Sequence, residues 1–221
     1  MWSWIGMRAA LGAVALATAS CMPIAGTQSP SPLFEAEISV IDDEARSRMT
    51  TSWRPGCPVG LDQLRLVTLS HWGLDSEVHT GELVVHRDVA DEVVQIFSTV
   101  FAARFPIERM DLVDVFGADD DRSMVANNTS AFNCRFVAGT SRWSQHAFGR
   151  AIDINPLLNP YVQSDGRIDP PEGAIYADRA PRKGLIRGGD EVVTAFNTAG
   201  WSWGGNWANS QDYQHFSRSG N

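Results

Sequence analysis

The chain has 221 residues, of which 43% are hydrophobic and 20% charged, a composition that suits a globular protein with one core. Its net charge of −8 argues against a nucleic-acid binder, because phosphate binding requires clustered lysine and arginine side chains. The sequence has no basic run that would provide such a cluster.

Residues 1–26 have the pattern of an export segment. Arg8 supplies a positive charge, and the apolar run over residues 9–19 is too short to span a bilayer. The run ends in Ala17-Thr18-Ala19-Ser20-Cys21, which fits the cleavage site of a secretory signal peptide and also resembles a bacterial lipobox, whose cysteine is lipidated. Both interpretations predict an exported domain in the cell envelope. A lipid on Cys21 would be its only membrane attachment.

Residues 27–56 are rich in serine, proline and threonine and then carry mixed charge, so they are predicted to form a linker. The domain is expected to span residues 57–221. If Cys21 is lipidated or removed, Cys57 and Cys134 remain as a pair that an oxidising compartment would join. That disulfide would stabilise the fold by about 4 kcal/mol, because it closes a long loop. A cysteine metal site is the alternative, but no Cys-x-x-Cys spacing occurs.

The first half of the domain alternates short strands with one helix. Strands are predicted at residues 64–69 and 82–86, where β-branched residues cluster. Asp88 is expected to cap a helix with one apolar face, which runs to about Phe105 and ends at Pro106. Alternating apolar residues predict a strand over residues 110–116, followed by a polar turn.

The second half contains more loop. Residues 122–142 are mostly polar and are expected to face a substrate, with a short strand over residues 131–137. Residues 156–188 carry many prolines and glycines and are predicted as a surface loop. A helix follows between Asp190 and Gly200, and a final strand is expected at residues 212–217. The fold class is therefore α+β, a small antiparallel sheet with helices packed on one side in a single domain.

His146 and Asp153 are candidate metal ligands. In a flat strand residues seven apart point to opposite faces, so the pair can converge only if the chain turns between them, and Gly149 permits that turn. A carboxylate within the strand-like run around Asp153 is costly to bury unless it is paired or bound to metal. The alternative is that Asp153 only caps a turn before Pro156.

A second pair lies near the C-terminus. Asp212 precedes His215 by three residues, a spacing that lets the carboxylate reach a water molecule beside a metal ion held by His215. Two histidines and one aspartate leave an open position in a tetrahedral zinc site, which is the arrangement of a catalytic zinc. The His-Glu-x-x-His helix of other zinc proteases is absent.

These residues form a joint motif that resembles the zinc D-alanyl-D-alanine carboxypeptidase family, which also includes D-Ala-D-Ala dipeptidases and L-alanyl-D-glutamate endopeptidases of peptidoglycan stem peptides. The motif is Ser144-x-His146-x-x-Gly149-x-Ala151-x-Asp153, then Trp203-Gly204-Gly205-x-Trp207 and Asp212-x-x-His215. The similarity is judged to extend over residues 57–216. It implies a metallopeptidase fold and a peptidoglycan peptide as the substrate, and we expect a monomer.

The resemblance implies that His146, Asp153 and His215 bind Zn²⁺ and that Asp212 is the general base. The family also has an arginine that contacts substrate and stabilises the oxyanion in a Ser-Gly-Tyr-Arg setting. Here Ser130-Ala131-Phe132-Asn133 has asparagine at that position, so Arg135, two residues on, is the preferred candidate, and Arg122 is its rival.

Ser144 in the motif and Trp203, which could wall the cleft, are further candidate substrate contacts. A place for Trp203 in the core is the alternative. A cysteine peptidase that uses Cys134 is a competing enzyme class, and a zinc- or peptidoglycan-binding module without catalysis is the competing non-enzyme class.

Overall fold

The computed structural model describes residues 1–2 and 32–220. The chain divides into two units, Met1–Ser31 and Pro32–Asn221, and the second unit contains every helix and strand named below. Its first sheet consists of three antiparallel strands in the order β1 (Ala36–Val40), β2 (Leu64–Trp72) and β3 (Val78–His86). The strands predicted at residues 64–69 and 82–86 are confirmed and are longer than expected.

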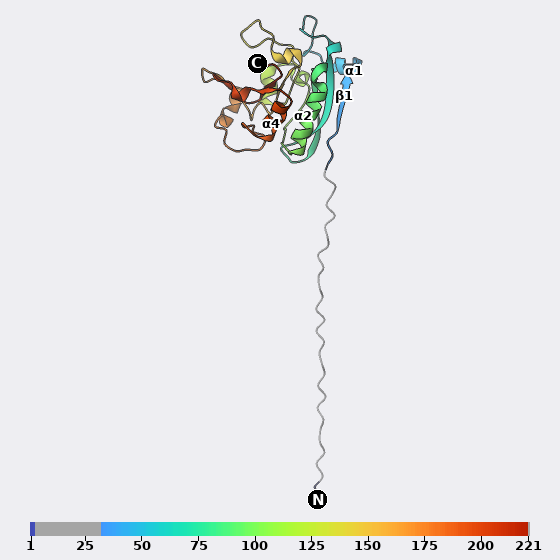
Figure 1. Cartoon of the computed structure of the whole chain (residues 1–221), viewed down its shortest axis with the longest axis vertical. Helices are drawn as coiled ribbons and strands as arrows, with labels where there is room; N and C mark the ends of the chain where they lie inside the picture. Colours follow the sequence, from blue (N-terminus) through green and yellow to red (C-terminus); the bar gives the residue numbers. More distant parts are fainter. Residues whose placement is uncertain (3–31, 221) are drawn as a thin grey trace. The chain divides into compact units, whose positions relative to one another are not determined.

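Both faces of this sheet are covered. One face packs against helix α2 (Ala90–Ala102), which lies along the sheet beside α4 (Glu191–Thr198) in Figure 1. The apolar residues of α2 recur every three or four positions, so one side of the helix is buried. The main core lies here, and its largest fully buried side chains include Phe97, Ile96, Leu69, Leu83 and Phe196.

The other face of the sheet packs against the start of the unit. Helix α1 (Asp43–Arg48) begins at Asp42, whose carboxylate accepts a hydrogen bond from the backbone of Ala45, and Ala45 and Met49 are buried in a second core cluster. The prediction of a linker over residues 27–56 is therefore wrong from Pro32 onward. Strand β1 pairs with β2, and this strand and α1 complete the fold rather than tether it.

The disulfide between Cys57 and Cys134 is confirmed, and it joins residues 77 positions apart at the edge of the second cluster. Because Cys134 is bonded to Cys57, its sulfur is not a free nucleophile, and the structure gives no support to the cysteine-peptidase alternative.

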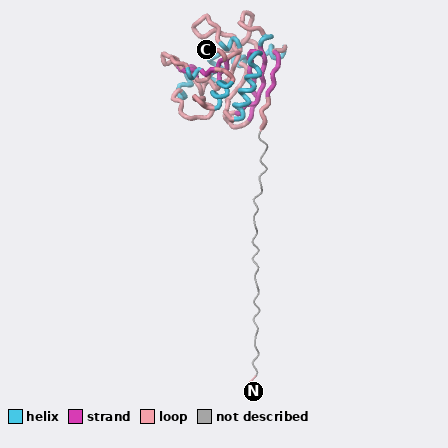
Figure 2. The backbone as a smooth tube through the Cα atoms, viewed as in Figure 1, coloured by secondary structure: helices cyan, strands magenta, loops and turns pink. Residues whose placement is uncertain are grey.

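The rest of the unit is mostly loop, as Figure 2 shows, and it carries two further three-stranded antiparallel sheets. One has the order β4 (Ala151–Asp153), β9 (His215–Ser217), β7 (Ser202–Trp203), and the other β6 (Ile168–Asp169), β5 (Tyr161–Val162), β8 (Gln211–Asp212). The remaining helix is α3 (Asp120–Val125), and six short 3₁₀ turns connect the elements: η1 (Leu61–Gln63), η2 (Arg87–Val89), η3 (Val113–Phe116), η4 (Gln145–Phe148), η5 (Pro171–Tyr176) and η6 (Gly204–Asn206). The α+β class is confirmed.

Several local predictions differ from the structure. Residues 113–116 form a 3₁₀ turn that ends at the left-handed Gly117, and no strand covers residues 110–116. Residues 131–137 have no strand either. Asp88 lies inside the turn η2 before α2, so it does not cap that helix, whereas Asp190 caps α4 as expected. The final segment splits into β8 and β9, which belong to different sheets.

The region over residues 156–188 is also more than a surface loop. It contributes β5, β6 and η5, and it buries Leu158, Leu185 and Ile186. The fully buried Asn159 connects its parts: the two N–H donors of its amide lie within hydrogen-bond distance of the carbonyls of Ile154, Asn155 and Gly184. These bonds satisfy backbone groups that would otherwise be stranded inside the protein.

Among the described residues, none of the helices has the length and apolar character needed to cross a membrane. The predicted export segment, its cleavage site and the candidate lipidation residue Cys21 lie outside the described residues.

Candidate metal centre

The structure brings the three predicted metal ligands together from three elements. His146 lies in the 3₁₀ turn η4, Asp153 ends strand β4, and His215 begins strand β9. Asp153 and His215 are directly opposite each other in the antiparallel pair of β4 and β9, so their side chains share one face of that sheet. All three residues are buried.

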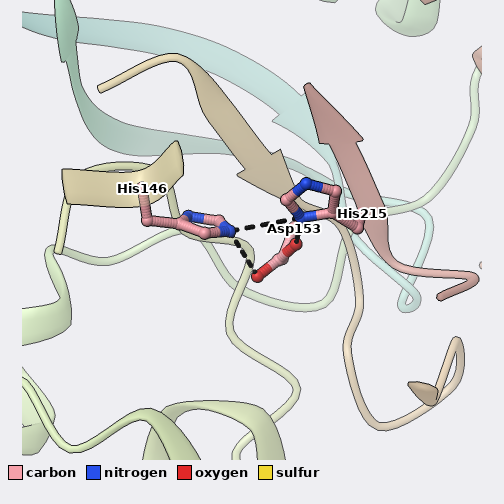
Figure 3. Close-up of side chains that lie close together, drawn as sticks. All are labelled: His146, Asp153 and His215. Atoms are coloured by element: carbon pink, nitrogen blue, oxygen red, sulfur yellow. Dashed lines mark hydrogen bonds and ion pairs between the residues drawn. The ribbon is translucent and has the colours of Figure 1, made fainter. Parts of the chain in front are cut away.

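The ligand atoms converge on one point. In Figure 3 the carboxylate of Asp153 lies between the two imidazole rings. Its Oδ2 is 3.1 Å from His146 Nε2 and its Oδ1 is 2.9 Å from His215 Nδ1, while the two nitrogens are 3.3 Å apart. One ligand atom from each residue lies within 4.8 Å of the others.

These separations fit a tetrahedral metal ion. Zinc–nitrogen and zinc–oxygen bonds of about 2.0–2.1 Å at tetrahedral angles place neighbouring ligand atoms about 3.3 Å apart. The two ring nitrogens are separated by that distance, and each lies slightly closer to one of the two Asp153 oxygens. Three ligands of this type leave one position of a tetrahedron open. The side chains therefore fit a zinc ion with little movement.

Local structure fixes the orientation of His146. Ser144 begins the turn η4, where its Oγ accepts a hydrogen bond from the backbone N–H of His146. The ring nitrogen Nδ1 of His146 lies 2.6 Å from the carbonyl oxygen of Ala131 and must donate to it. That bond places the lone pair on Nε2, the atom that faces Asp153 and His215.

Gly149 makes the turn that the sequence required. Its φ angle of 64° is in the left-handed region, and a Cβ at this position would lie 2.6 Å from the backbone nitrogen of His86. The chain can therefore reverse tightly between His146 and Asp153, and the two side chains converge as predicted.

The charges within the triad support one another. Burial by itself would lower the pKa of His146, but the adjacent carboxylate of Asp153 outweighs it and the pKa is raised. Burial works in the opposite sense on Asp153, and the two histidines still hold the pKa of its carboxyl far below the ordinary value. The carboxyl of Asp153 is thus ionised at neutral pH, as a metal ligand must be.

Asp212, the predicted base, lies beside the triad. It is on strand β8, which belongs to the third sheet and precedes β9 in the chain. Its Oδ1 is buried and has no hydrogen-bond partner among the described residues. The pKa of Asp212 is raised to about 7, chiefly by burial and also by the charge of Asp153, while His215 opposes the rise. A half-buried carboxyl with an unsatisfied oxygen and a near-neutral pKa is suited to accepting and returning a proton.

Gly204 allows this close approach. It starts the turn η6, and a Cβ built on it would lie 2.7 Å from the carbonyl oxygen of Asp212, 2.9 Å from the Asp212 Cβ and 3.3 Å from the His215 Cβ. Any larger residue would push the candidate base and the metal ligand away, which explains glycine at this place in the Trp-Gly-Gly motif.

Arg135 lies within electrostatic reach of His146 and Asp212. Its Nη2 forms an ion pair of 2.7 Å with Asp120 Oδ2, its side chain is 28% exposed, and its Nε is buried without a partner among the described residues. Burial raises the pKa of Asp120, and the arginine opposes that rise. The ion pair with Asp120 therefore holds the Arg135 guanidinium near the triad, and the Nε–H of this guanidinium has no hydrogen-bond acceptor among the described residues.

The other candidate substrate residues are placed differently. Arg122 has a side chain that is 76% exposed and is ion-paired with Asp119 on the surface, so the structure does not bring it to the triad. Trp203 is buried in the main core, and its Nε1–H donates a hydrogen bond to the carbonyl of Tyr213. It therefore packs beneath the strands that carry the site and does not line a cleft. Ser144 is buried and caps η4, and its contact with substrate stays a prediction.

Sequence reasoning missed Asp120, the carbonyl of Ala131 and the role of Gly204. Asp120 was visible only as one of three aspartates in a polar turn. A backbone carbonyl leaves no trace in the residue types, and the steric need for Gly204 depends on the approach of β8. The glycine pair between two tryptophans was the one usable signal.

Comparison with known proteins connects this geometry to a family. A family model described as D-alanyl-D-alanine carboxypeptidase matches residues 138–218, which include all three candidate ligands and Asp212. The match is shorter than the expected span of residues 57–216 and leaves out Arg135. Neither the curated proteins nor the solved structures give a significant match. Residues 138–218, which contain the His-Asp-His triad, are thus similar to the D-alanyl-D-alanine carboxypeptidase family.

Proposed function

We propose that the protein is an exported zinc-dependent peptidase that hydrolyses peptidoglycan stem peptides as a D-alanyl-D-alanine carboxypeptidase. The observation that carries the proposal is the buried His146–Asp153–His215 triad with Asp212 beside it. The family description names this activity, and the disulfide suits an oxidising compartment outside the cytoplasm. An L-alanyl-D-glutamate endopeptidase is the alternative within the same family, with the same catalytic residues.

His146, Asp153 and His215 would hold the zinc ion. When bound, zinc would polarise the scissile carbonyl and make a water molecule acidic enough to attack near neutral pH. Asp153 would contribute the negative charge of the ligand set, and the Ala131 carbonyl would keep His146 in the required tautomer.

Asp212 would act as the general base and then as the general acid. Its ionised carboxylate would take a proton from the attacking water, and the resulting acid would give that proton to the leaving amine. Burial raises the pKa of this carboxyl to about 7 in the protein without metal, and a bound cation would lower it toward the ionised form that accepts the proton. The buried, unpartnered Oδ1 keeps one oxygen available for the exchange.

Arg135 would stabilise negative charge on the carbonyl oxygen as the bond to water forms. Asp120 would hold the guanidinium in place, which lowers the entropic cost of positioning a long side chain. A module that only binds zinc or cell wall has no need for a carboxyl such as Asp212 beside its metal ligands, and this residue favours catalysis over that alternative.

The proposal is tested by metal content and product analysis together. The full-length protein is assayed for zinc by mass spectrometry and incubated with a pentapeptide stem that ends in D-Ala-D-Ala, with and without a chelator. We expect about one zinc per chain and release of D-alanine that stops on chelation and returns with added zinc. Cleavage after L-alanine instead would identify the endopeptidase, and zinc without cleavage would identify the binding module. Absence of zinc would refute the proposal.

A further inference from the structure

The third sheet presents a row of side chains that continues from the candidate base. Tyr161 on β5 is directly opposite Asp212 on β8 and also directly opposite Asp169 on β6. Residues paired in this way place their side chains on the same face of a sheet. Asp212, Tyr161 and Asp169 therefore form a line across one face, beginning at the catalytic carboxyl.

Aromatic rings join this face to the metal centre. The ring of Tyr161 meets the ring of Trp207 edge to face at 6.3 Å, and Trp207 lies 5.6 Å from the ring of His215. Tyr161 and Trp207 are both only half-buried. They form a continuous wall from the metal ligand to the middle strand of the third sheet, and an extended peptide can lie against such a wall.

Asp169 stands at the far end of the row with capacity to bind a cation. One carboxylate oxygen, Oδ2, accepts a hydrogen bond from Gln163, which shares the face with Tyr161 because it is two residues further along the chain. No described residue donates to Oδ1 of Asp169 in the hydrogen bonds of this region. The neighbouring cation, Arg167, donates its hydrogen bonds to Asp165 and to the side-chain Oε1 of Gln163, and it acts on Asp169 only through its charge.

The spacing defines what the row can reach. Two strand separations put Asp169 about 10 Å from Asp212 across the sheet. An extended substrate peptide advances about 3.3 Å per residue. A residue one or two positions from the scissile bond would therefore reach Asp169 if it carried a long side chain with a terminal ammonium group. A neutral side chain could not donate a charged hydrogen bond to Oδ1, the oxygen of Asp169 that the Gln163 amide does not reach.

We propose that Asp169 and Tyr161 form a specificity subsite that selects a substrate residue with a side-chain ammonium group, such as a diamino acid. The inference rests on the proposed function, because it deepens the substrate class of the same site. Tyr161 provides the surface against which the aliphatic part of that side chain lies, and Asp169 accepts a hydrogen bond from its ammonium group.

The test uses matched peptides and the full-length, zinc-loaded protein. A stem-length peptide series carries lysine or norleucine at one position at a time, so that each pair differs by one ammonium group. We expect kcat/KM to be about fivefold higher for lysine at one position, the size of a half-exposed ion pair. In Asp169→Asn that preference falls to within about twofold while cleavage of the norleucine peptide is unchanged. Asp62→Asn, which changes an exposed aspartate in η1, is the control and keeps the preference.

The same peptides are titrated by calorimetry, so the preference is also measured as a ratio of dissociation constants. If neither peptide is cleaved but wild type binds the lysine peptide more tightly and Asp169→Asn does not, the subsite stands and the proposed function fails. If the peptides are cleaved with no lysine preference at any position, or if the preference survives Asp169→Asn, the subsite is wrong and the proposed function stands.

Discussion

The two halves of the folded unit are held together in different ways. The half around the first sheet has long paired strands, a 13-residue helix and apolar cores on both faces. The half that carries the candidate site has strands of two or three residues and relies on buried polar residues such as Asn155 and Asn159. The hydrophobic effect stabilises the first half through buried area, while specific hydrogen bonds position the second.

This difference separates stability from chemistry. A substitution in the first half should act on the free energy of unfolding and leave the site intact in molecules that fold. A substitution in the second half should act on metal binding or turnover with little effect on the core. Four changes test that separation.

The largest effect is expected from His215→Ala. Loss of one of three ligands should abolish stoichiometric zinc and reduce activity by about 10³-fold or more, because the metal supplies much of the transition-state stabilisation. Zinc content and D-alanine release measure this, and far-UV circular dichroism should remain native. His79→Ala, which removes an exposed histidine paired with Asp75, is the control and should keep both properties. Retention of zinc by His215→Ala would contradict the ligand assignment.

Replacing Cys57 and Cys134 together by alanine tests the scaffold. The unfolding free energy should fall by about 4 kcal/mol, because the unfolded chain gains the entropy of a loop that spans 77 positions. Chemical denaturation measures this loss. Zinc bound per folded molecule should stay the same, and a parallel loss of zinc would show that the two halves are not separable.

Asp212→Asn should lower kcat by about a hundredfold to a thousandfold while zinc stays bound. The carboxyl must be ionised to accept a proton, so wild-type activity should fall as pH drops below its pKa. That pKa is about 7 in the protein without metal, and a bound cation shifts it lower. The pH profile of kcat/KM should lose this acid limb in the variant. If the variant keeps the fall of kcat/KM at low pH, another group causes that fall and acts as the base.

The smallest effect is expected from Gly204→Ala. The added Cβ must displace Asp212 or His215 by a fraction of an ångström, which should cost about tenfold to a hundredfold in kcat/KM with little loss of stability. Gly188→Ala is the matched control, because its Cβ would meet only the Trp203 ring at an ordinary 3.6 Å. Equal activity in the two variants would show that the close approach of Gly204 is not needed.

The sequence predicted the chemistry of the site better than its surroundings. Spacing and residue type paired His146 with Asp153 and Asp212 with His215. The resemblance of the joint motif to a known family then predicted that the two pairs form one site. Elements with strong periodicity, such as α2, were also predictable. Residues 110–116 were not, since alternating apolar residues suit a buried turn as well as a strand.

Other features depend on contacts that no local pattern encodes. Strand β1 is an edge strand with mostly exposed residues, so its composition suggested a linker, and only its pairing with β2 orders it. Trp203 lies in the core because strand β7 pairs with β9, which places Trp203 directly opposite the buried Phe216. The sequence alone did not show which of three consecutive aspartates pairs with Arg135. The structure resolves this, because Asp119 caps helix α3 and Asp120 is its first residue.

If Arg135 has the role proposed above, its ion pair with Asp120 affects how strongly it binds the substrate relative to the transition state. A guanidinium already neutralised by a carboxylate attracts a free anion weakly, so a negatively charged substrate or product would gain little from it in the ground state. Charge that develops next to the unused Nε would still gain a directed hydrogen bond. Arg135 would thus discriminate in favour of the transition state, and Asp120 would limit inhibition by the carboxylate that each hydrolysis releases.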